Sequence, residues 1–322
     1  MKRILGIIGL IAGVLGWMVL SPAYCAAPVE VTVSIQPQRY FVEKIGGERV
    51  VVTVMVEPGA EPHVYDPKPR QMASLTRSKI YFALGVPFED VWLPKFAAAS
   101  PGMRVVHTEA GIQKLPMAAH DHHEERPGTG RAHYSSSPHE HHLEVLDPHI
   151  WLSPPLVMIQ ARHIFTALVQ VDPGHRALYE QNYRKFLDEL AILDLDLLRL
   201  FGEVSGRREV MVFHPAWAYF ASAYGLQQTP IEIEGKEPRA ANLKHLIEHA
   251  RKNQVKALFV QPQFSATTAA VIAEALGSQV ITADPMAFDW ARNLREVAEK
   301  FKAALQQESG REPADTARGK LG

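Results

Sequence analysis

One stretch of the chain repeats its apolar side chains at helical spacing for about thirty residues. It begins at Asp172 and Pro173 and continues to about Val204, before Ser205 and Gly206. Its apolar positions are Leu178, Tyr183, Phe186, Leu187, Leu190, Leu193, Leu197, Leu198 and Phe201. Because a helix rises 1.5 Å per residue, about thirty residues span roughly 45 Å, enough to run the length of a two-lobed molecule. The segment therefore predicts a rigid connection between two lobes.

Short β-branched runs alternate with amphipathic stretches on both sides of this segment, which predicts βαβ units and parallel sheets. Before it, we expect strands at 29–35, 50–56, 79–84 and 104–107, and helices at 39–45, 69–76, 88–98 and 154–169. After it, we expect strands at 209–213, 229–232, 257–261 and 279–283, and helices at 216–224, 241–253, 266–276 and 290–306. The expected fold class is α/β, with two lobes that each hold a mainly parallel sheet flanked by helices, joined by one long rigid helix.

The same pattern divides the chain into five predicted parts. They are a signal peptide at 1–27, an N-terminal lobe at 28–172 with a histidine-rich loop at 116–146, a linker helix at 173–206, a C-terminal lobe at 207–306 and a flexible tail at 307–322.

The first residues have the composition of a secretory signal. Lys2 and Arg3 precede an apolar run that ends near Leu20, and small residues follow it. An uncleaved membrane anchor is the alternative, because the run is just long enough to span a bilayer if tilted. Lipid anchoring at Cys25 is not expected, because Tyr24 before it is too bulky for the usual lipidation pattern. We therefore predict a secreted chain.

Cysteine and charge exclude several classes of protein. Cys25 is the single cysteine, so a chain cleaved after it has no disulfide and no cysteine-ligated metal site. Without Lys2 and Arg3, 32 basic residues face 35 acidic ones, a formal charge of −3 with neutral histidines. That balance gives no electrostatic footprint for nucleic acid, so no nucleic-acid partner is expected.

Three histidines stand between prolines or aromatic residues where one predicted segment gives way to the next. In open α/β sheets, ligands gather outside the carboxyl ends of the strands. His63 follows the strand that ends at 56, His214 ends the strand at 209–213, and Asp284 ends the strand at 279–283. His149 can join them from the first lobe. Three nitrogens and one carboxylate oxygen form a ligand set suited to zinc.

The loop at 116–146 carries further histidines among acidic residues. Imidazole is a common ligand of zinc, copper and nickel, so this composition predicts metal binding. Flexible ligands must be ordered before they bind, so these sites should be weaker than a preformed one. The predicted secondary sites use His120, His122, His123, His133, His139, His141 and His142.

At these residues the chain resembles the zinc-specific periplasmic substrate-binding proteins of bacterial ABC importers, the metal-binding class with a long linker helix. The shared motifs are Pro58 to Pro69, Asp147 to Pro154, Phe213 to Phe220, Glu237-Pro238, Phe259 to Phe264 and Asp284-Pro285. Relatives that carry manganese or iron tend to have a carboxylate at the position of His214, so a histidine there favours zinc.

The resemblance implies that His63, His149 and His214 bind the metal and that Asp284 can be a fourth ligand. The chain reads Pro-Met-Ala-Phe after Asp284, which departs from the commoner Pro-Leu-Gly, so Glu61 or water can take the fourth position instead. The resemblance also implies transported Zn²⁺, a membrane permease as partner, a periplasmic location and a monomer. Because the long helix limits hinge motion, closure is expected to be modest and local to the His149 and Asp284 sides.

Three other functions are alternatives: a manganese or iron receptor of the same type, a periplasmic metal buffer, and a secreted metalloenzyme. A buffer would need only the histidine-rich loop. The sequence has no His-Glu-x-x-His motif and no Gly-x-Ser-x-Gly motif, so no enzyme is expected.

Overall fold

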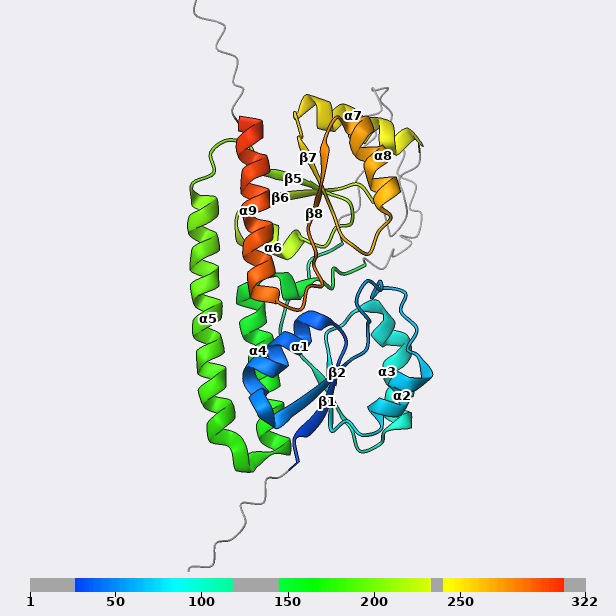
Figure 1. Ribbon diagram of the computed structural model, residues 1–322, viewed down its shortest axis with the longest axis vertical. Helices are drawn as coiled ribbons and strands as arrows, with labels where there is room; N and C mark the ends of the chain where they lie inside the picture. The colour runs from blue at the N-terminus through cyan, green and yellow to red at the C-terminus, as the bar shows by residue number, and fades with distance from the viewer. Residues whose placement is uncertain (1–26, 118–144, 233–239, 310–322) are drawn as a thin grey trace, which may run out of the picture.

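The computed structural model of the protein describes residues 27–117, 145–232 and 240–309 (Figure 1). The predicted signal peptide, most of the histidine-rich loop and most of the predicted tail therefore lie outside the described residues. Among the residues that are described, no helix combines the length and the apolar composition needed to cross a membrane.

The N-terminal lobe is built on a parallel sheet of β1 (Val29–Val33), β2 (Val50–Val54), β3 (Ile80–Ala83) and β4 (Arg104–His107) in the order β2-β1-β3-β4. Helices α1 (Gln36–Gly46) and α4 (Pro154–Val171) lie on one side of it in Figure 1, and α2 (Pro69–Leu75) and α3 (Pro87–Ala99) on the other. Because helices cover both faces, the inner strand β3 is buried throughout and the other inner strand, β1, nearly so.

The C-terminal lobe repeats this topology. Its parallel strands β5 (Glu209–Val212), β6 (Gln227–Pro230), β7 (Ala257–Val260) and β8 (Gln279–Thr282) follow the order β6-β5-β7-β8. Helices α6 (Ala218–Ala223), α7 (Ala240–Lys252), α8 (Ala266–Leu276) and α9 (Trp290–Ser309) surround the sheet. The predicted fold class is confirmed: the described chain forms two lobes with parallel sheets.

The predicted linker is helix α5 (Arg176–Gly202), which passes along the side of both lobes in Figure 1. A short 3-10 turn, Pro173–His175, leads into it. The helix packs against α1 and α4 in the first lobe and against α9 in the second. It buries one stripe of side chains, Tyr179, Phe186, Leu190, Leu193, Leu197 and Phe201, and exposes the opposite face to solvent.

A single apolar core continues through both lobes. It includes side chains of the first sheet and α1, the buried stripe of α5, and Trp217, Trp290 and Phe301 of the second lobe. Phe41 of α1 meets Trp290 of α9 edge-on, with ring centroids 5.1 Å apart. A second, smaller cluster lies only in the outer part of the C-terminal lobe, around Leu246, Leu258 and Ile272. The two lobes are thus joined by close-packed side chains as well as by the chain itself.

Candidate metal centre

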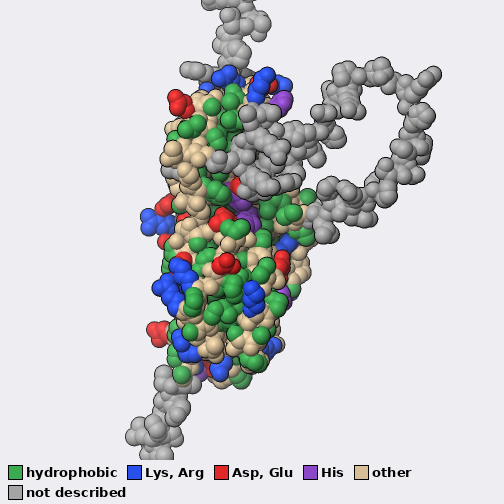
Figure 2. Space-filling view, turned by 90° about the vertical axis from the view of Figure 1, so that its right-hand side faces the viewer, with side chains coloured by type: hydrophobic (Ala, Val, Ile, Leu, Met, Phe, Trp, Pro, Cys, Tyr) green, Lys and Arg blue, Asp and Glu red, His purple; other side chains and the backbone are tan. Residues whose placement is uncertain are grey.

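Three histidines from distant parts of the sequence meet between the two lobes. His63 lies in the loop after β2, His149 directly precedes the 3-10 turn Ile150–Leu152, and His214 follows β5. One ligand atom from each of them lies within 4.8 Å of the others. The ring centroids are 5.1 to 5.4 Å apart. Figure 2 shows histidine and acidic side chains together near the middle of the molecule.

Each ring is held by a carboxylate on its Nδ1 side. His149 donates from Nδ1 to Asp147 Oδ1 over 2.7 Å, and His214 donates from Nδ1 to Glu232 Oε2 over 2.7 Å. His63 makes the same bond to Glu61. An ionised carboxylate can only accept, so Nδ1 carries the hydrogen and Nε2 keeps its lone pair. The three rings therefore offer Nε2 as the ligating atom.

The Nε2 atoms of His63 and His214 are buried and have no hydrogen-bond partner among the described residues. A buried polar atom without a partner costs about 1–3 kcal/mol, so such atoms usually mark a missing ligand or water. Nitrogen atoms that converge at this spacing suit Zn²⁺, which binds imidazole at about 2.0–2.1 Å in tetrahedral geometry. The three histidines thus fit a transition-metal ion with room for one further ligand.

The protonation states favour metal binding. Burial lowers the pKa of His149, and the neighbouring carboxylate of Asp147 offsets only part of that effect, so the ring is neutral at pH 7. Burial acts to raise the pKa of Glu61, but the hydrogen bonds from the ring and backbone of His63, together with any positive charge on His63 and His214, lower it by more, so the pKa lies below its usual value. The Glu61 carboxylate is therefore ionised at pH 7 and accepts from His63.

The residues predicted as fourth ligands are not part of the histidine cluster. Asp284 follows β8, as expected, and its Oδ1 accepts hydrogen bonds from the Met286 backbone at 2.9 Å and from Gln263 Nε2 at 3.3 Å. Among the described residues, the cluster of mutually close ligand atoms contains the three histidines alone. Asp284, Glu61 and water remain the candidates for the fourth position. The predicted secondary sites at His120, His122, His123, His133, His139, His141 and His142 lie outside the described residues.

Sequence reasoning missed that carboxylates support the candidate ligands: it named Glu61 only as a possible fourth ligand, and it named neither Asp147 nor Glu232. The signal for two of them is a repeated acid-Pro-His triplet, Glu61-Pro-His63 and Asp147-Pro-His149. In both, the carboxylate accepts from the backbone nitrogen of the histidine two residues later as well as from its ring, over 3.1 Å and 2.8 Å for the backbone bonds. At Asp147 this is the local side-chain-to-backbone turn that short acidic residues favour.

His214 is held by residues that are distant in sequence. Gln261 donates from Nε2 to the His214 carbonyl over 2.9 Å and accepts from the His214 backbone nitrogen over 3.4 Å. Glu232 and Gln261 are 5% and 2% exposed, so these contacts are shielded from water.

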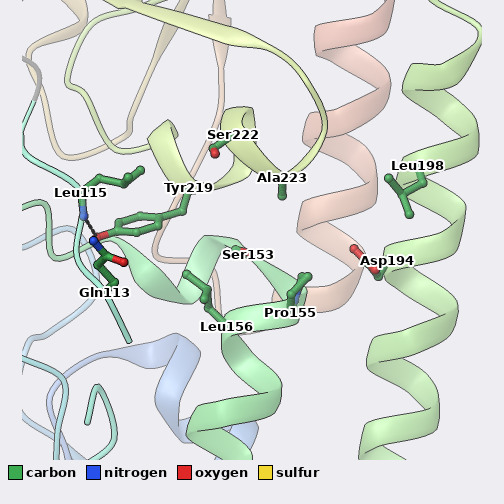
Figure 3. A pocket seen from close by; sticks show the side chains of 10 residues that line it. All are labelled: Gln113, Leu115, Ser153, Pro155, Leu156, Asp194, Leu198, Tyr219, Ser222 and Ala223. Atoms are coloured by element: carbon green, nitrogen blue, oxygen red, sulfur yellow. Dashed lines mark hydrogen bonds between the residues drawn. The ribbon is translucent and has the colours of Figure 1, made fainter. Parts of the chain in front are cut away.

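A separate groove lies near the N-terminus of α4, between α5 and α6 (Figure 3). The three histidines take no part in its lining, which includes Ser153, Pro155, Asp194, Leu198, Tyr219 and Ser222. We therefore place the metal centre at the histidine cluster and not in this groove.

Similarity to known proteins assigns the chain to a family. The family described as zinc-uptake complex component A, periplasmic (ZnuA), matches residues 31–304. The chain belongs to the ZnuA family. The predicted resemblance to zinc-specific periplasmic substrate-binding proteins of ABC importers is thereby confirmed. Members of this family are the periplasmic substrate-binding components of transport systems.

Individual members of the family agree with this assignment. The high-affinity zinc uptake system protein ZnuA of Bacillus subtilis (strain 168) is 27% identical over 256 residues, which cover 78% of this chain and 76% of that protein. A crystal structure of ZnuA is 42% identical, with a TM-score of 0.77, and covers 86% of this chain and 99% of that one. A ZnuA deletion mutant with zinc bound is 40% identical, with a TM-score of 0.77, over 89% of this chain and 100% of that one.

Proposed function

We propose that the protein captures Zn²⁺ between its two lobes in the periplasm and delivers it to the membrane permease of an ABC importer. The observation that carries the proposal is the convergence of three imidazoles, each held by a carboxylate so that Nε2 faces the others. His63, His149 and His214 bind the ion through Nε2. The protein carries out no chemical step, and it works as a monomer.

The ligand set favours zinc over manganese. Manganese prefers oxygen donors, whereas three imidazole nitrogens suit zinc, copper and nickel. The carboxylates of Asp147 and Glu232, behind the rings of His149 and His214, compensate the positive charge of the ion without occupying its coordination sphere. The fourth position is left to Asp284, Glu61 or water.

The histidine-rich loop has a different role in this proposal. Its stem is a short antiparallel contact in which Pro116 pairs with Leu146 and Met117 donates to Val145 over 2.7 Å. The ends of the loop are therefore held together close to the His149 segment. We propose that its histidines gather zinc, or sense its excess, and do not hold the ion for transport.

The test is a zinc titration against a competing chelator. One tight site is expected in the wild type, and His63→Ala, His149→Ala or His214→Ala should each weaken it at least tenfold, about 1.4 kcal/mol. The control is His245→Ala, because His245 is exposed on α7 and lies outside the cluster. Three single variants that bind zinc like the wild type would contradict the site. Many equivalent weak sites would indicate a buffer instead of a transport receptor.

A further inference from the structure

Tyr219 of α6 bonds to the backbone of the segment that carries His149. Its hydroxyl donates to the Asp147 carbonyl over 2.8 Å and accepts from the Leu115 backbone nitrogen over 2.9 Å. Figure 3 shows the ring reaching from α6 toward Leu115 at the edge of the groove. The side chain is 5% exposed, so a side chain of the second lobe bonds, out of contact with water, to the two segments of the first lobe that meet at the Pro116–Leu146 bridge.

The residue that Tyr219 holds is the one that orients a proposed zinc ligand. The backbone nitrogen of Asp147 donates to the Leu115 carbonyl over 2.8 Å, so the main chain of Asp147 is held through both its nitrogen and its carbonyl oxygen. Its carboxylate accepts from both the backbone nitrogen and Nδ1 of His149. Asp147 and His149 are 1% and 3% exposed. An unbroken path of short contacts thus leads from the Tyr219 hydroxyl to the His149 ring.

A second tie holds the same segment farther along. Trp151 donates from Nε1 to the Pro285 carbonyl over 2.7 Å, and Trp290 donates from Nε1 to the Trp151 carbonyl over 2.8 Å. Both indoles are fully buried. The His149 segment is therefore bonded to the C-terminal lobe at each end, although it belongs to the N-terminal lobe by sequence.

His63 has weaker support. Its carboxylate partner Glu61 comes from the same loop, and its side chain is 21% exposed, against 3% for His149 and 9% for His214. His63 is therefore the most exposed of the three proposed ligands. The expectation that closure is local to the His149 and Asp284 sides stays a prediction.

We propose that Tyr219 is a positioning residue for zinc binding, which holds Asp147 from the second lobe and so keeps the Nε2 atom of His149 facing His214. The inference rests on the proposed function. Burial raises the pKa of Tyr219 to about 12, so the phenol keeps its hydrogen and remains a donor at any physiological pH.

Tyr224 provides a matched control at the end of the same helix. It is 3% exposed, and its hydroxyl donates to Asp194 Oδ1 over 2.9 Å. Tyr219→Phe and Tyr224→Phe each remove one buried hydroxyl, so both should lower the melting temperature. Only Tyr219→Phe should weaken zinc binding, by roughly three- to tenfold, the range for one hydrogen bond. The measurement is a zinc titration of both variants against a chelator.

A double-mutant cycle tests whether Tyr219 acts through Asp147. In the Asp147→Ala background, where His149 has lost its carboxylate partner, adding Tyr219→Phe should change zinc affinity by less than about twofold, because effects along one path do not add. In the Co²⁺-loaded protein, the exchangeable Nδ1 proton of a ligating histidine gives a strongly shifted NMR signal. Tyr219→Phe should broaden one such signal, and Tyr224→Phe should leave all of them unchanged.

The outcomes separate this inference from the proposed function. Tight zinc binding in the wild type, with equal affinity in the two phenylalanine variants, would overturn the role of Tyr219 and leave the function intact. Loss of folding in Tyr219→Phe alone would also overturn it, because the hydroxyl would then serve the fold. A wild-type protein without a tight zinc site would overturn both.

Discussion

Glu232 offers a sharp test of the idea that carboxylates behind the rings prepare the site. It contacts Nδ1 of His214 and, by our interpretation, never touches the ion. Glu232→Ala removes the acceptor and the charge together. Glu232→Gln removes the charge but keeps an amide oxygen that can accept from Nδ1. The pair of variants therefore separates orientation of the ring from compensation of the ion's charge.

The size of the effect follows from burial and distance. The two side chains are 9% and 6% exposed and their bond is 2.7 Å long, so solvent weakens the contact little. A hydrogen bond to a charged group contributes about 1.5–3 kcal/mol, and loss of such a partner typically lowers metal affinity 10- to 100-fold. We expect Glu232→Ala to weaken zinc binding by that factor. Glu232→Gln keeps a neutral bond of about 0.5–1.5 kcal/mol and should lose less than tenfold.

The assay is competition with a zinc chelator of known affinity, at constant pH and salt. Glu248→Ala is the control, because Glu248 is an exposed acid on α7 whose side chain is 61% accessible. Wild-type affinity in Glu232→Ala would refute the reasoning that ring orientation matters. Equal losses in the alanine and glutamine variants would show that charge alone decides the affinity.

Four further changes have expected outcomes. His214→Glu puts an oxygen donor in place of a nitrogen, so the ratio of zinc to manganese affinity should fall. An unchanged ratio in competition titrations would mean that selectivity arises from other residues. Zinc affinity should fall as pH drops below about 6.5, because ligation needs neutral imidazole. Calorimetry over pH 5–8 measures the affinity, and an affinity that does not change with pH would contradict the prediction. Replacing residues 118–144 with an Asn-Gly turn should remove the weak sites and keep the tight one, since the stem at Met117 and Val145 already holds the chain ends together. Loss of the tight site would mean that the loop supplies a main ligand. Burial raises the pKa of Glu89 to about 7 from an ordinary value of 4.5. Its contribution to the free energy of unfolding is therefore largest below about pH 4.5 and is lost as the pH rises to about 7. Urea unfolding of Glu89→Gln should therefore show a flatter pH dependence between 5 and 7 than the wild type, and equal slopes would contradict the assignment.

The architecture could be predicted from the sequence because its signals are local. The long helix follows from the apolar spacing along α5, and most strands from short apolar or β-branched runs between helical stretches. Strand β6 is the exception, because its residues Gln227–Pro230 are mostly polar and it begins two residues before the expected strand at 229–232. The three histidines could be found because each lies where a segment ends, and parallel strands present such ends on one edge. Asp147 could have been found too, because Asp147-Pro-His149 repeats the pattern of the His63 loop.

Glu232 could not be found in that way, because its position depends on strand register. Val212 of β5 pairs with Pro230 of β6, and the same offset places His214 beside Glu232 two residues later. Sequence periodicity gave both strands but not which strands are neighbours. Gln261 depends on register in the same sense, since it follows β7, the other neighbour of β5. The supports of a site are thus harder to predict than its ligands, because they come from pairings between distant segments.

The continuous core bears on how this protein could be made into a zinc sensor. Fluorescent proteins fused to the two lobes would report little, because packed side chains such as Phe41 and Trp290 keep the lobes at a nearly fixed separation. An environment-sensitive dye on the His63 loop should perform better. Val64 is 81% exposed and adjoins the ligand with the fewest supports, so a cysteine placed there would carry a label whose surroundings change when the ion arrives. Cys25 is the single cysteine of the sequence, so in a chain that is cleaved after it, as predicted, that label would be the only thiol adduct.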